Sequence, residues 1–477
     1  MKRTVCSLLT LLSLCVSCGV LAQSKPNILW IISEDMSQDL GCYGNASVRT
    51  PNLDKLAKEG MRFTRVFTTA AVCAPSRTAL VTGMYQTAIG AMHMRYSDAL
   101  KPELPEGIKT VEALFMQNGY QTLGVGKDDY MFRLDGKSFQ YTSIDDLDKD
   151  KPFFAKVNST YPHRVFGEDK KHPVDPSGIT LPPYYPDVTP IREDWAAYFE
   201  SIQLLDNEVG DILEQFRKRG LLRNTIIFFL SDHGRPFIRG KYWTYDSGIQ
   251  IPFIISVPKG MKAPAGYAAG SVNHEMISSI DITATSLALA GLKKPDYMQG
   301  KIFLGDERES AREVVFSAID RISGTYFKTR AVRSDKFKYI RNYNNGRSVL
   351  ECTTEYAKAM YPCYNAINIL DNYNKLTGAQ KTLVTPLPLE ELYDLEEDPH
   401  ETNNLAYNAD FAVIRNKMEL LLNTWIREID DKGFYPDSRE VEKHFIDTRI
   451  GDKEKYRDAR LKSYLKIERQ LKEKGII

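Results

Sequence analysis

Residues 27–35 read Asn-Ile-Leu-Trp-Ile-Ile-Ser-Glu-Asp, an apolar run that ends in three polar residues. A strand buried on both faces of a sheet has this continuous pattern, whereas a strand with one wet face alternates apolar and polar residues. Residues 225–230 (Thr-Ile-Ile-Phe-Phe-Leu) repeat the pattern and again lead into polar residues, Ser231-Asp232-His233. These two runs predict a mostly parallel central sheet that is buried between layers of helices.

Helical patterns lie between the predicted strands. From residue 195 to residue 219, apolar residues recur at the spacing of one helix face, and Gly220 follows as a stop signal. A shorter helix is predicted over residues 51–60, and a further strand over residues 120–125. Because strands and helices alternate, this part of the chain is expected to form an α/β sandwich.

The sequence pattern changes in the last third of the chain. Residues 330–343 alternate polar and apolar side chains, as antiparallel strands do, and residues 410–432 and 453–474 have charged helical patterns. We therefore expect an α/β domain over residues 23–310 and a smaller α+β subdomain with an antiparallel sheet over residues 311–477.

The first 22 residues have the layout of a secretory signal peptide. Lys2 and Arg3 precede a short apolar run, and Val20-Leu21-Ala22 offers a small-residue cleavage site. Cys18 provides an alternative, a lipidated N-terminal cysteine. No other segment is apolar enough to cross a bilayer, so we expect a mature chain that is exported to the periplasm or secreted, without a transmembrane segment.

The overall composition excludes several classes of protein. The 477 residues include 63 Lys and Arg against 62 Asp and Glu, a balance that argues against nucleic acid as a partner. Hydrophobic residues make up 43% of the chain, so extensive disorder is excluded. Cys352 and Cys363 are close enough in sequence to close a short disulfide loop, but spacing alone does not fix the pairing.

Acidic residues follow both predicted central strands, as Glu34-Asp35 and Asp232-His233. Ligands of open α/β sheets bind at the carboxyl ends of the strands, where these side chains are expected to meet. Carboxylates brought together there would repel one another unless a cation lay between them, and hard oxygen ligands favour Ca²⁺ or Mg²⁺ over zinc. The alternative is that the acids cap the helices that follow the strands.

The most informative motif is residues 73–83, Cys-Ala-Pro-Ser-Arg-Thr-Ala-Leu-Val-Thr-Gly. It resembles the signature of the formylglycine-dependent (type I) sulfatases, Cys-x-Pro-Ser-Arg followed by Leu-x-Thr-Gly. The resemblance implies an alkaline-phosphatase-like α/β fold and the conversion of Cys73 to formylglycine by a maturation enzyme. In that family one hydroxyl of the hydrated aldehyde attacks sulfur, and the second expels sulfate as the aldehyde re-forms.

Other stretches resemble the same family in the same order, and together they cover roughly residues 26–406. The resemblance implies that Arg77 holds the formylglycine hydroxyls, and that Lys127 and Lys241 bind the sulfate oxygens. It implies that His163 protonates the leaving oxygen or nitrogen. The family pattern assigns the metal site to Glu34, Asp35, Asp232 and His233.

Two positions depart from the commonest pattern of the family. Many members have a histidine where this chain has Asp129, and asparagine is common where it has His233. His93 has three interpretations: it replaces the missing histidine in space, it contacts substrate, or it merely lies in a loop. The expected substrate contacts are His93, Arg95, Asp129 and Arg235, with His172 and Arg239 as further candidates.

Residues 232–237 and 241–243 resemble the heparan N-sulfatase (sulfamidase) branch of the family more than the arylsulfatases. We therefore expect an exo-acting hydrolase that removes O-sulfate or N-sulfate from sulfated glycans such as glycosaminoglycans. Two alternatives stay open at this point. The Asp232-His233 pair favours a phosphoester or phosphonate hydrolase of the same superfamily, and Asp129 favours a glycan-binding homologue without catalysis.

Overall fold

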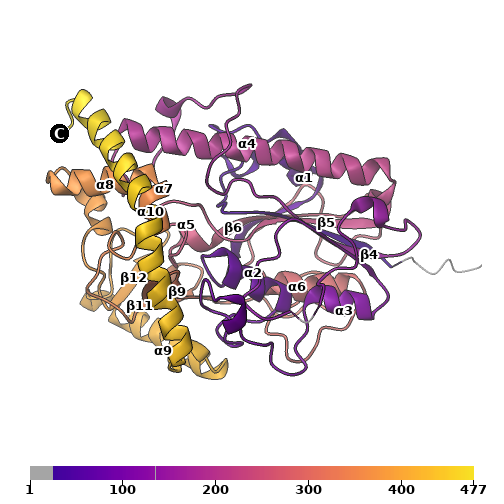
Figure 1. The fold of residues 1–477 in the computed structure, drawn as a ribbon. Coiled ribbons are helices and arrows are strands. Elements are labelled where there is room, and N and C mark those ends of the chain that lie inside the picture. The colour runs from indigo at the N-terminus through magenta and orange to yellow at the C-terminus, as the bar shows by residue number, and fades with distance from the viewer. Residues whose placement is uncertain (1–24, 135) are drawn as a thin grey trace, which may run out of the picture.

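The computed structural model describes residues 25–134 and 136–477 of the chain. The predicted signal segment, including Cys18, lies outside the described residues. Two sheets form, with helices packed around them (Figure 1). Within the described ranges, no helix combines the length and the apolarity that a membrane crossing requires.

The larger sheet has eight strands and is mostly parallel, which confirms the predicted architecture. At its centre, β1 (Asn27–Ser33) has β4 (Phe153–Asn158) and β5 (Thr225–Ser231) as parallel neighbours. The order is β3-β4-β1-β5-β6-β2-β7, and β8 pairs with β2. Among the described strands of this sheet, β6 alone runs antiparallel. The remaining strands are β2 (Met61–Phe67), β3 (Gln121–Val125), β6 (Gln250–Ser256), β7 (Val272–Asn273) and β8 (Ile277–Ser278).

Alternate side chains of β1 enter two different apolar cores, as the pleat of a strand requires. Leu29 and Ile31 belong to the core on the side of α4, whereas Trp30 faces the opposite layer and donates a hydrogen bond to Ser286 of α6 at 3.0 Å. Figure 1 shows α1 and α4 on one face of the sheet and α2, α3 and α6 on the opposite face. These helices are α1 (Pro51–Glu59), α4 (Thr189–Lys218), α2 (Cys73–Thr82), α3 (Val111–Gln117) and α6 (Ser279–Leu289).

The smaller sheet has four antiparallel strands in the order β12-β11-β10-β9, as predicted for the C-terminal part. Its strands are β9 (Val315–Ile322), β10 (Thr325–Arg333), β11 (Phe337–Asn342) and β12 (Glu390–Asp394). The accompanying helices are α7 (Glu355–Met360), α8 (Pro362–Asn372), α9 (Ala412–Glu428) and α10 (Arg439–Glu473). The domain boundary between residues 310 and 311 stays a prediction.

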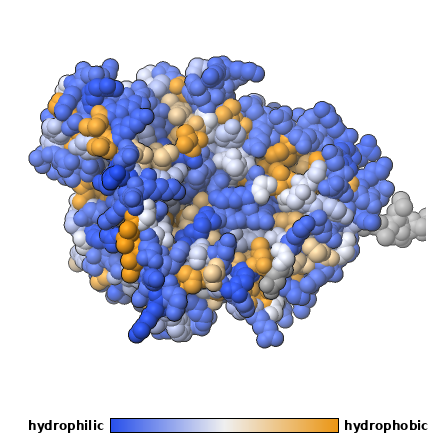
Figure 2. Space-filling model, viewed as in Figure 1, coloured by the Kyte–Doolittle hydropathy of each residue, from blue (hydrophilic) through white to orange (hydrophobic). Residues whose placement is uncertain are grey.

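The surface is mostly hydrophilic on the face that Figure 2 shows, with hydrophobic residues scattered among the polar ones. On α10, for example, Ile446 and Ile450 are 60% and 62% exposed. Scattered apolar side chains are ordinary on protein surfaces.

Buried ion pairs connect the two sheets. Asp246, in the short helix α5 (Asp246–Ile249), accepts hydrogen bonds from Lys338 at 2.8 Å and from Arg333 at 3.2 Å. Burial alone would raise the pKa of the Asp246 carboxyl, but the two cations outweigh burial and lower this pKa to about 2. Lys338 also contacts Glu401 at 2.8 Å. Complementary charges therefore hold the smaller sheet to the segment that follows β5.

The pairing of Cys352 with Cys363, which the sequence left open, does not form, because both thiols are free in the structure. The two side chains have separate surroundings. Cys352 accepts a hydrogen bond from Arg347 Nη2 at 3.1 Å, whereas Cys363 lies in the first turn of α8 and is completely buried beside the backbone of Ile238.

Candidate active site

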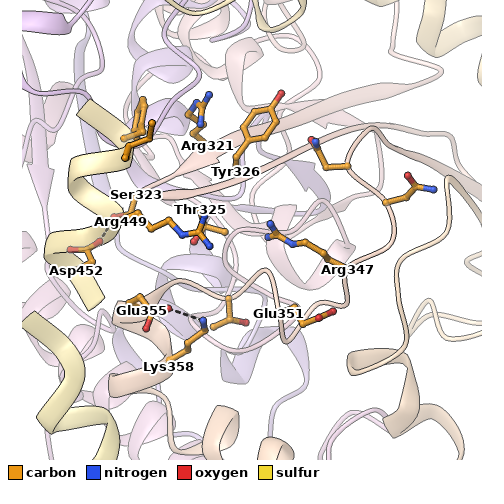
Figure 3. A pocket seen from close by; sticks show the side chains of 16 residues that line it. Arg321, Ser323, Thr325, Tyr326, Arg347, Glu351, Glu355, Lys358, Arg449 and Asp452 are labelled. Carbon is orange, nitrogen blue, oxygen red and sulfur yellow. Dashed lines mark hydrogen bonds and ion pairs between the residues drawn. The ribbon is translucent and has the colours of Figure 1, made fainter. Parts of the chain in front are cut away.

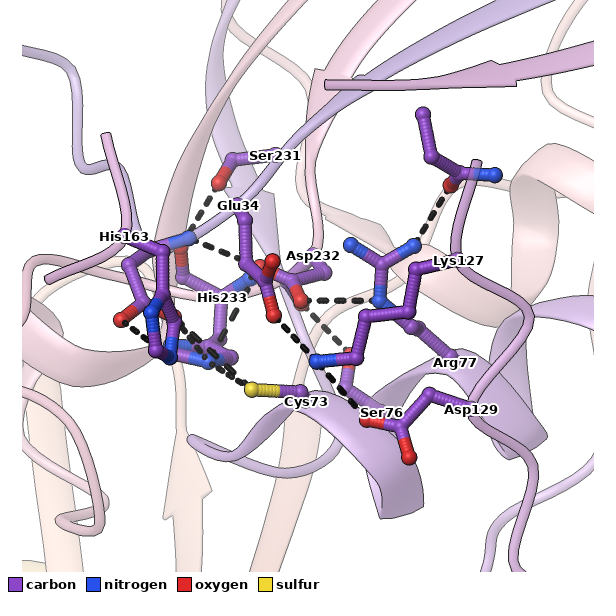
Figure 4. Close-up of polar contacts among 12 residues, drawn as sticks. Glu34, Cys73, Ser76, Arg77, Lys127, Asp129, His163, Ser231, Asp232 and His233 are labelled. Atoms are coloured by element: carbon purple, nitrogen blue, oxygen red, sulfur yellow. Dashed lines mark hydrogen bonds and ion pairs between the residues drawn. The ribbon is translucent and has the colours of Figure 1, made fainter. Parts of the chain in front are cut away.

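The candidate site lies at the carboxyl ends of β1 and β5, beside the first turn of α2 (Figure 4). Ser33 and Ser231 pair in register at the ends of these strands. The residues that follow therefore meet, and the Asp35 N–H donates a hydrogen bond to Asp232 Oδ1 at 3.0 Å. Asp35 has a φ of 61°, a left-handed conformation that is strained for a residue other than glycine and that is typical of functional positions.

Cys73 is the first residue of α2 and points at this junction. Its Sγ lies 3.4 Å from His233 Nε2 and 3.8 Å from Asp35 Oδ1, and the residue is only 1% exposed. Ser76, one turn further on, donates a hydrogen bond to the backbone carbonyl of Asp232 at 2.6 Å. This contact fixes the start of α2 against the end of β5, and with it the direction of the cysteine.

Acidic and imidazole groups surround the cysteine closely enough to share a cation. Ligand atoms lie within 4.8 Å of one another in two groups that share Asp35 and Cys73, namely Glu34, Asp35, Cys73, His163 and Asp35, Cys73, Asp232, His233. The three carboxylates outnumber the two imidazoles in this donor set, and carboxylate oxygens fit a hard divalent cation. The residues therefore suit the metal site that the sequence predicts.

The two aspartates are charged despite their burial. Burial alone would raise the pKa of the Asp35 carboxyl, but Lys241, His163 and His233 outweigh burial and hold that pKa well below its usual value. The pKa of the Asp232 carboxyl is lowered against burial by His233 and Arg77 in the same way. Burial alone would lower the pKa of the His233 imidazole, but the neighbouring carboxylates outweigh burial and raise this pKa to about 10.

Two buried cations reach into the cluster. Lys241 Nζ contacts both oxygens of Asp35, at 2.7 and 2.8 Å. Arg77 donates from Nε to Asp232 Oδ2 at 3.0 Å and from Nη1 to Asn158 Oδ1 at 2.6 Å. Its third nitrogen, Nη2, is buried and has no hydrogen-bond partner among the described residues. A buried donor without a partner is costly, so Arg77 has the N–H groups of Nη2 available for a further ligand at this site.

The outer part of the site contains more exposed groups. Lys127 Nζ lies between Glu34 and Asp129, 3.0 Å from Asp129 Oδ2, and its side chain is 32% exposed. Asp129 also accepts hydrogen bonds from Nη1 and Nη2 of Arg95, whose side chain is 45% exposed. His163 is 30% exposed, with Nε2 3.9 Å from Asp35 Oδ2. The charge of Asp129, which would repel an anionic substrate, is thus compensated by two cations.

Other predicted residues lie apart from this cluster. His93 is 2% exposed, packs against Tyr96 and Phe445, and pairs with Asp437 at 2.9 Å, so of its three interpretations the structure favours a packed loop residue. Arg235 pairs with Asp39 at 3.2 Å. The further candidates differ in their surroundings: Arg239 is 1% exposed and donates to two backbone carbonyls, whereas His172 pairs with Asp169.

Asn158 is a site residue that the sequence analysis missed. It is the last residue of β4, is 7% exposed, and accepts a hydrogen bond from Arg77. The signal that could have found it is its position at the carboxyl end of a strand parallel to β1, the same edge that carries the acids.

Comparisons with known proteins agree with this geometry. The family model for sulfatases matches residues 26–143 and 138–292, and the model for the N-sulphoglucosamine sulphohydrolase C-terminal region matches residues 237–352. An ulvan-active sulfatase of Formosa agariphila is 31% identical over 470 residues, covering 88% of this chain and 78% of that protein. Human N-sulphoglucosamine sulphohydrolase is 26% identical, covering 89% and 93% of the two chains. A protein solved with its substrate D-glucosamine-2-N,6-O-disulfate superposes with a TM-score of 0.62 at 20% identity, covering 87% of this chain and all of that one.

The fold and the site together define a sulfuric ester hydrolase with an alkaline-phosphatase-like architecture. The chain belongs to the sulfatase family, and it resembles the N-sulphoglucosamine sulphohydrolase branch as predicted. This family depends on a metal and on formylglycine, and the buried acidic cluster is a suitable metal site. The interpretations as a phosphoester hydrolase and as a non-catalytic glycan binder are therefore not favoured.

Proposed function

We propose that this sulfatase removes O-sulfate or N-sulfate groups from sulfated glycans such as glycosaminoglycans. The observation that carries the proposal is the position of the signature cysteine, with Cys73 Sγ 3.4 Å from His233 Nε2 and 3.8 Å from Asp35 Oδ1. The names of two relatives, an ulvan-active sulfatase and an N-sulphoglucosamine sulphohydrolase, support a sulfated sugar as substrate.

The proposed cofactors are a divalent cation and formylglycine at position 73, made by a separate maturation enzyme. The oxygen-rich donor set favours Ca²⁺, with Mg²⁺ as the second choice, and the cation would orient the sulfate and draw charge from it. The formylglycine hydrate would supply one nucleophilic hydroxyl and a second hydroxyl whose deprotonation releases sulfate. The residues proposed to hold the cation are Glu34, Asp35, Asp232 and His233.

The side chains around position 73 have complementary tasks in this proposal. Arg77 would orient the hydroxyls there with the unpaired N–H groups of its buried Nη2. Lys127 and Lys241 would bind the sulfate oxygens, because both amines bring positive charge to the place where negative charge develops in the transition state. His163, which is 30% exposed, would donate a proton to the leaving oxygen or nitrogen.

The outer residues are proposed to contact the rest of the substrate. Arg95 and Arg235 keep 45% and 19% of their side chains exposed and are suited to anionic groups. Asp129 would act by positioning Lys127 and Arg95. Because Cys73 is so deeply buried, a chain end would reach it more readily than the middle of a chain, which favours exo action.

The signal-like N-terminal segment supports export to the periplasm or secretion of the mature chain. Export of the enzyme agrees with a large, sulfated substrate that lies outside the cytoplasm. Residues 23–310 are proposed as the catalytic domain and residues 311–477 as the smaller subdomain, because the sequence pattern changes after about residue 310.

The test is sulfate release from a panel of N-sulfated and O-sulfated monosaccharides and oligosaccharides. It requires protein in which conversion of Cys73 has been confirmed by mass, with Cys73→Ala as the matched control. We expect release from one class of sugar and none from the control, and the active class would choose between N-sulfatase and O-sulfatase. Turnover that survives in Cys73→Ala, or silence across the whole panel with formylglycine present, would contradict the proposal.

A further inference from the structure

A polar cavity of about 550 Å³ lies between the smaller sheet and α10 (Figure 3). Its walls carry charges of both signs, from Arg347 and Arg449 and from Glu351 and Asp452. None of the residues proposed for catalysis, all of which the structure describes, lines this cavity. A lining of mixed charge selects no particular ligand, so the cavity does not extend the proposed site.

Lys156 is an ionisable residue in the middle of a buried strand. Residues 153–157 read Phe-Phe-Ala-Lys-Val, and β4 lies between β3 and β1, so both of its edges are paired. Lys156 is 1% exposed. A lysine is almost never buried this completely unless its amine has partners, because an unpaired buried charge is costly. The contacts of Lys156 therefore indicate what a lysine does at this position.

The amine of Lys156 anchors the loop that follows β3, residues 126–130, which is termed the Lys127 loop below. Lys156 Nζ donates hydrogen bonds to Asp128 Oδ1 at 2.9 Å and to the hydroxyl of Tyr130. The rings of Tyr130 and Phe139 lie 4.6 and 4.9 Å from Nζ, close enough for cation–π attraction. One buried amine thus holds the loop at two places.

Two carboxylates stabilise the charged form of Lys156. Burial lowers the pKa of its amine, and the charges of Glu112 and Asp128 oppose that effect. Glu112 belongs to α3 and is completely buried, whereas Asp128 is the carboxylate that the loop supplies. The loop gains an anchor and the lysine gains a counter-ion from the same contact.

The Lys127 loop carries two residues of the outer active site. Lys127 Nζ lies between Glu34 and Asp129 (Figure 4). Because β3 ends at Val125, the loop lies beyond the hydrogen-bonded ladder of the sheet. The position of Lys127 therefore depends on the contacts that hold this loop.

Both ends of the Lys127 loop are fixed by hydrogen bonds. Asn158 Nδ2 donates to the carbonyl of Val125 at 3.2 Å, just before the loop. The Met131 N–H donates to the hydroxyl of Thr78 at 2.8 Å, just after the loop. Lys156 holds the middle of the loop between these two fixed ends.

Lys156 and Asn158 belong to the same face of β4, since residues two apart on a strand point to the same side. Asn158 accepts a hydrogen bond from Arg77 at 2.6 Å, and Lys156 donates to Asp128, the neighbour of Lys127. One face of β4 therefore contacts both the arginine proposed to hold the formylglycine hydroxyls and the loop of a lysine proposed to bind sulfate.

We propose that Lys156 is a positioning residue, which acts through Asp128 and Tyr130 to place Lys127 for binding the sulfate oxygens. This inference rests on the proposed function, since it deepens the role of Lys127 in the same site. Lys156 itself touches no reacting atom. Without its amine, the Lys127 loop would lose its central anchor, and Lys127 Nζ would move away from its carboxylate partners. A displacement of about 1 Å near a reacting centre can cost on the order of a hundredfold in rate.

The first test is a double-mutant cycle of Lys156→Met with Lys127→Ala, measured as kcat/KM for a sulfate ester. Methionine keeps an unbranched apolar stem and removes the amine. We expect Lys156→Met to lower kcat/KM by about ten- to hundredfold in the otherwise wild-type protein. In the Lys127→Ala protein the further loss should be less than about twofold, because residues that act together are not additive. Equal losses in both backgrounds would overturn the proposal.

Two further variants separate positioning from a general loss of stability. Asp128→Ala removes the other partner of the contact at a side chain that is 40% exposed, so the fold should survive, and kcat/KM should again fall only where Lys127 is present. Lys338→Met is the matched control, because it removes another completely buried, ion-paired lysine, in the smaller sheet. It should lower the Tm, but any loss of kcat/KM should be the same with and without Lys127. A loss that depended on Lys127 as strongly as in Lys156→Met would overturn the proposal.

A second measurement needs no turnover and therefore separates this proposal from the function on which it rests. Acetylation by acetic anhydride, followed by mass spectrometry, reports how accessible the Lys127 amine is in the metal-loaded protein; its side chain is 32% exposed. We expect Lys156→Met and Asp128→Ala to speed acetylation of Lys127 several-fold, with Lys293, 84% exposed, as the internal reference. Faster labelling supports the proposal even if no sulfate is ever released. Unchanged labelling in both variants would refute it.

Discussion

Asp35 is the residue on which most charges of the active site converge. Its carboxylate contacts Lys241 at 2.7 and 2.8 Å and His233 at 2.9 Å, and His163 lies 3.9 Å away. A single side chain thus links the proposed sulfate-binding lysine, the proposed metal site and the proposed general acid. Replacing it should disturb all three functions together, which makes it the most informative position to change.

Asp35→Ala is expected to abolish tight binding of the divalent cation, because it removes the carboxylate shared by both ligand groups. Since metal binding stabilises the folded state by linkage, a chelator should lower the Tm of the wild-type protein but leave the Tm of the variant unchanged. Metal analysis and thermal melts measure both effects. Asp296→Ala, at a side chain that is 92% exposed, is the control. A variant that binds as much metal as the wild type would remove Asp35 from the site.

His163→Ala tests the proposed proton donor. If His163 protonates the leaving group, its loss should slow the hydrolysis of substrates with poor leaving groups, such as the hydroxyl or amine of a sugar. Aryl sulfates, which have good leaving groups, should be affected less. The measurement is kcat/KM across a series of sulfate esters of graded leaving-group pKa, with and without the substitution. Equal losses along the series would assign His163 a positioning role instead.

At the residue scale, sequence reasoning succeeded where a motif fixed both residue type and place. Cys73, Arg77 and the two acidic pairs come together as expected, since the strands that precede the acids are easily recognised. Asn158 escaped, because a polar residue at the end of a buried strand has no distinguishing local pattern. The surroundings of His93 depend on Asp437, which is far away in sequence and whose neighbourhood no local pattern reveals.

Among the helices and strands, those that a local sequence pattern determines were predicted well, and those that depend on distant contacts were not. The central strands β1 and β5 match their predicted ranges, because a short, continuous apolar run that ends in polar residues is typical of a buried parallel strand. By contrast, α10 begins at Arg439 rather than near residue 453. Gly451 interrupts the helical pattern in the sequence, but the helix continues through it because Phe445 on one side and Leu471 on the other are buried against the rest of the protein.

The contact of α10 with the turn between β9 and β10 requires a glycine. A Cβ on Gly324 would lie 2.3 Å from both Cα and Cβ of Arg449, so one of the two backbones would have to shift. We expect Gly324→Ala to destabilise the protein by about 1–3 kcal/mol, the usual cost of overpacking. A lowered Tm would confirm the tight contact.

Gly451→Ala provides the matched comparison on the same helix. A Cβ at this position meets no atom within 4 Å, and alanine has a higher helix propensity than glycine. The substitution should therefore stabilise the protein by up to about 1 kcal/mol. Two glycine-to-alanine changes with opposite effects would separate close packing from helix propensity, whereas two equal effects would contradict the contact at Gly324.

At the scale of the whole molecule, the two sheets depend on buried charges at their junction. Asp246 beside the large sheet pairs with Arg333 and Lys338 of the small one. Within the smaller subdomain itself, the completely buried Arg330 of β10 pairs with Asp320 of β9 and with Asp431. Removing one partner of such a pair leaves an uncompensated buried charge and costs more than the pair contributes.

The Asp246 pairs predict how stability depends on pH. The pKa of this carboxyl is lowered from 3.8 to about 2 in the folded protein, so its contribution is fully present well above pH 3.8 and is lost as the pH falls towards 2. Asp246→Asn should therefore lower the Tm by several degrees at pH 7, and the difference from the wild type should shrink in acid. Melting curves between pH 7 and pH 2 measure this, with Asp296→Asn as the exposed control. A constant difference across that range would contradict the assignment.

The deep position of Cys73 has a consequence for biosynthesis. A side chain that is 1% exposed at the start of a packed helix gives no second protein access to its sulfur once the chain has folded. An enzyme that converts this residue must therefore act on the nascent or unfolded polypeptide. An expression host without that enzyme should yield correctly folded but inactive protein, and adding the enzyme to the purified product should not rescue it.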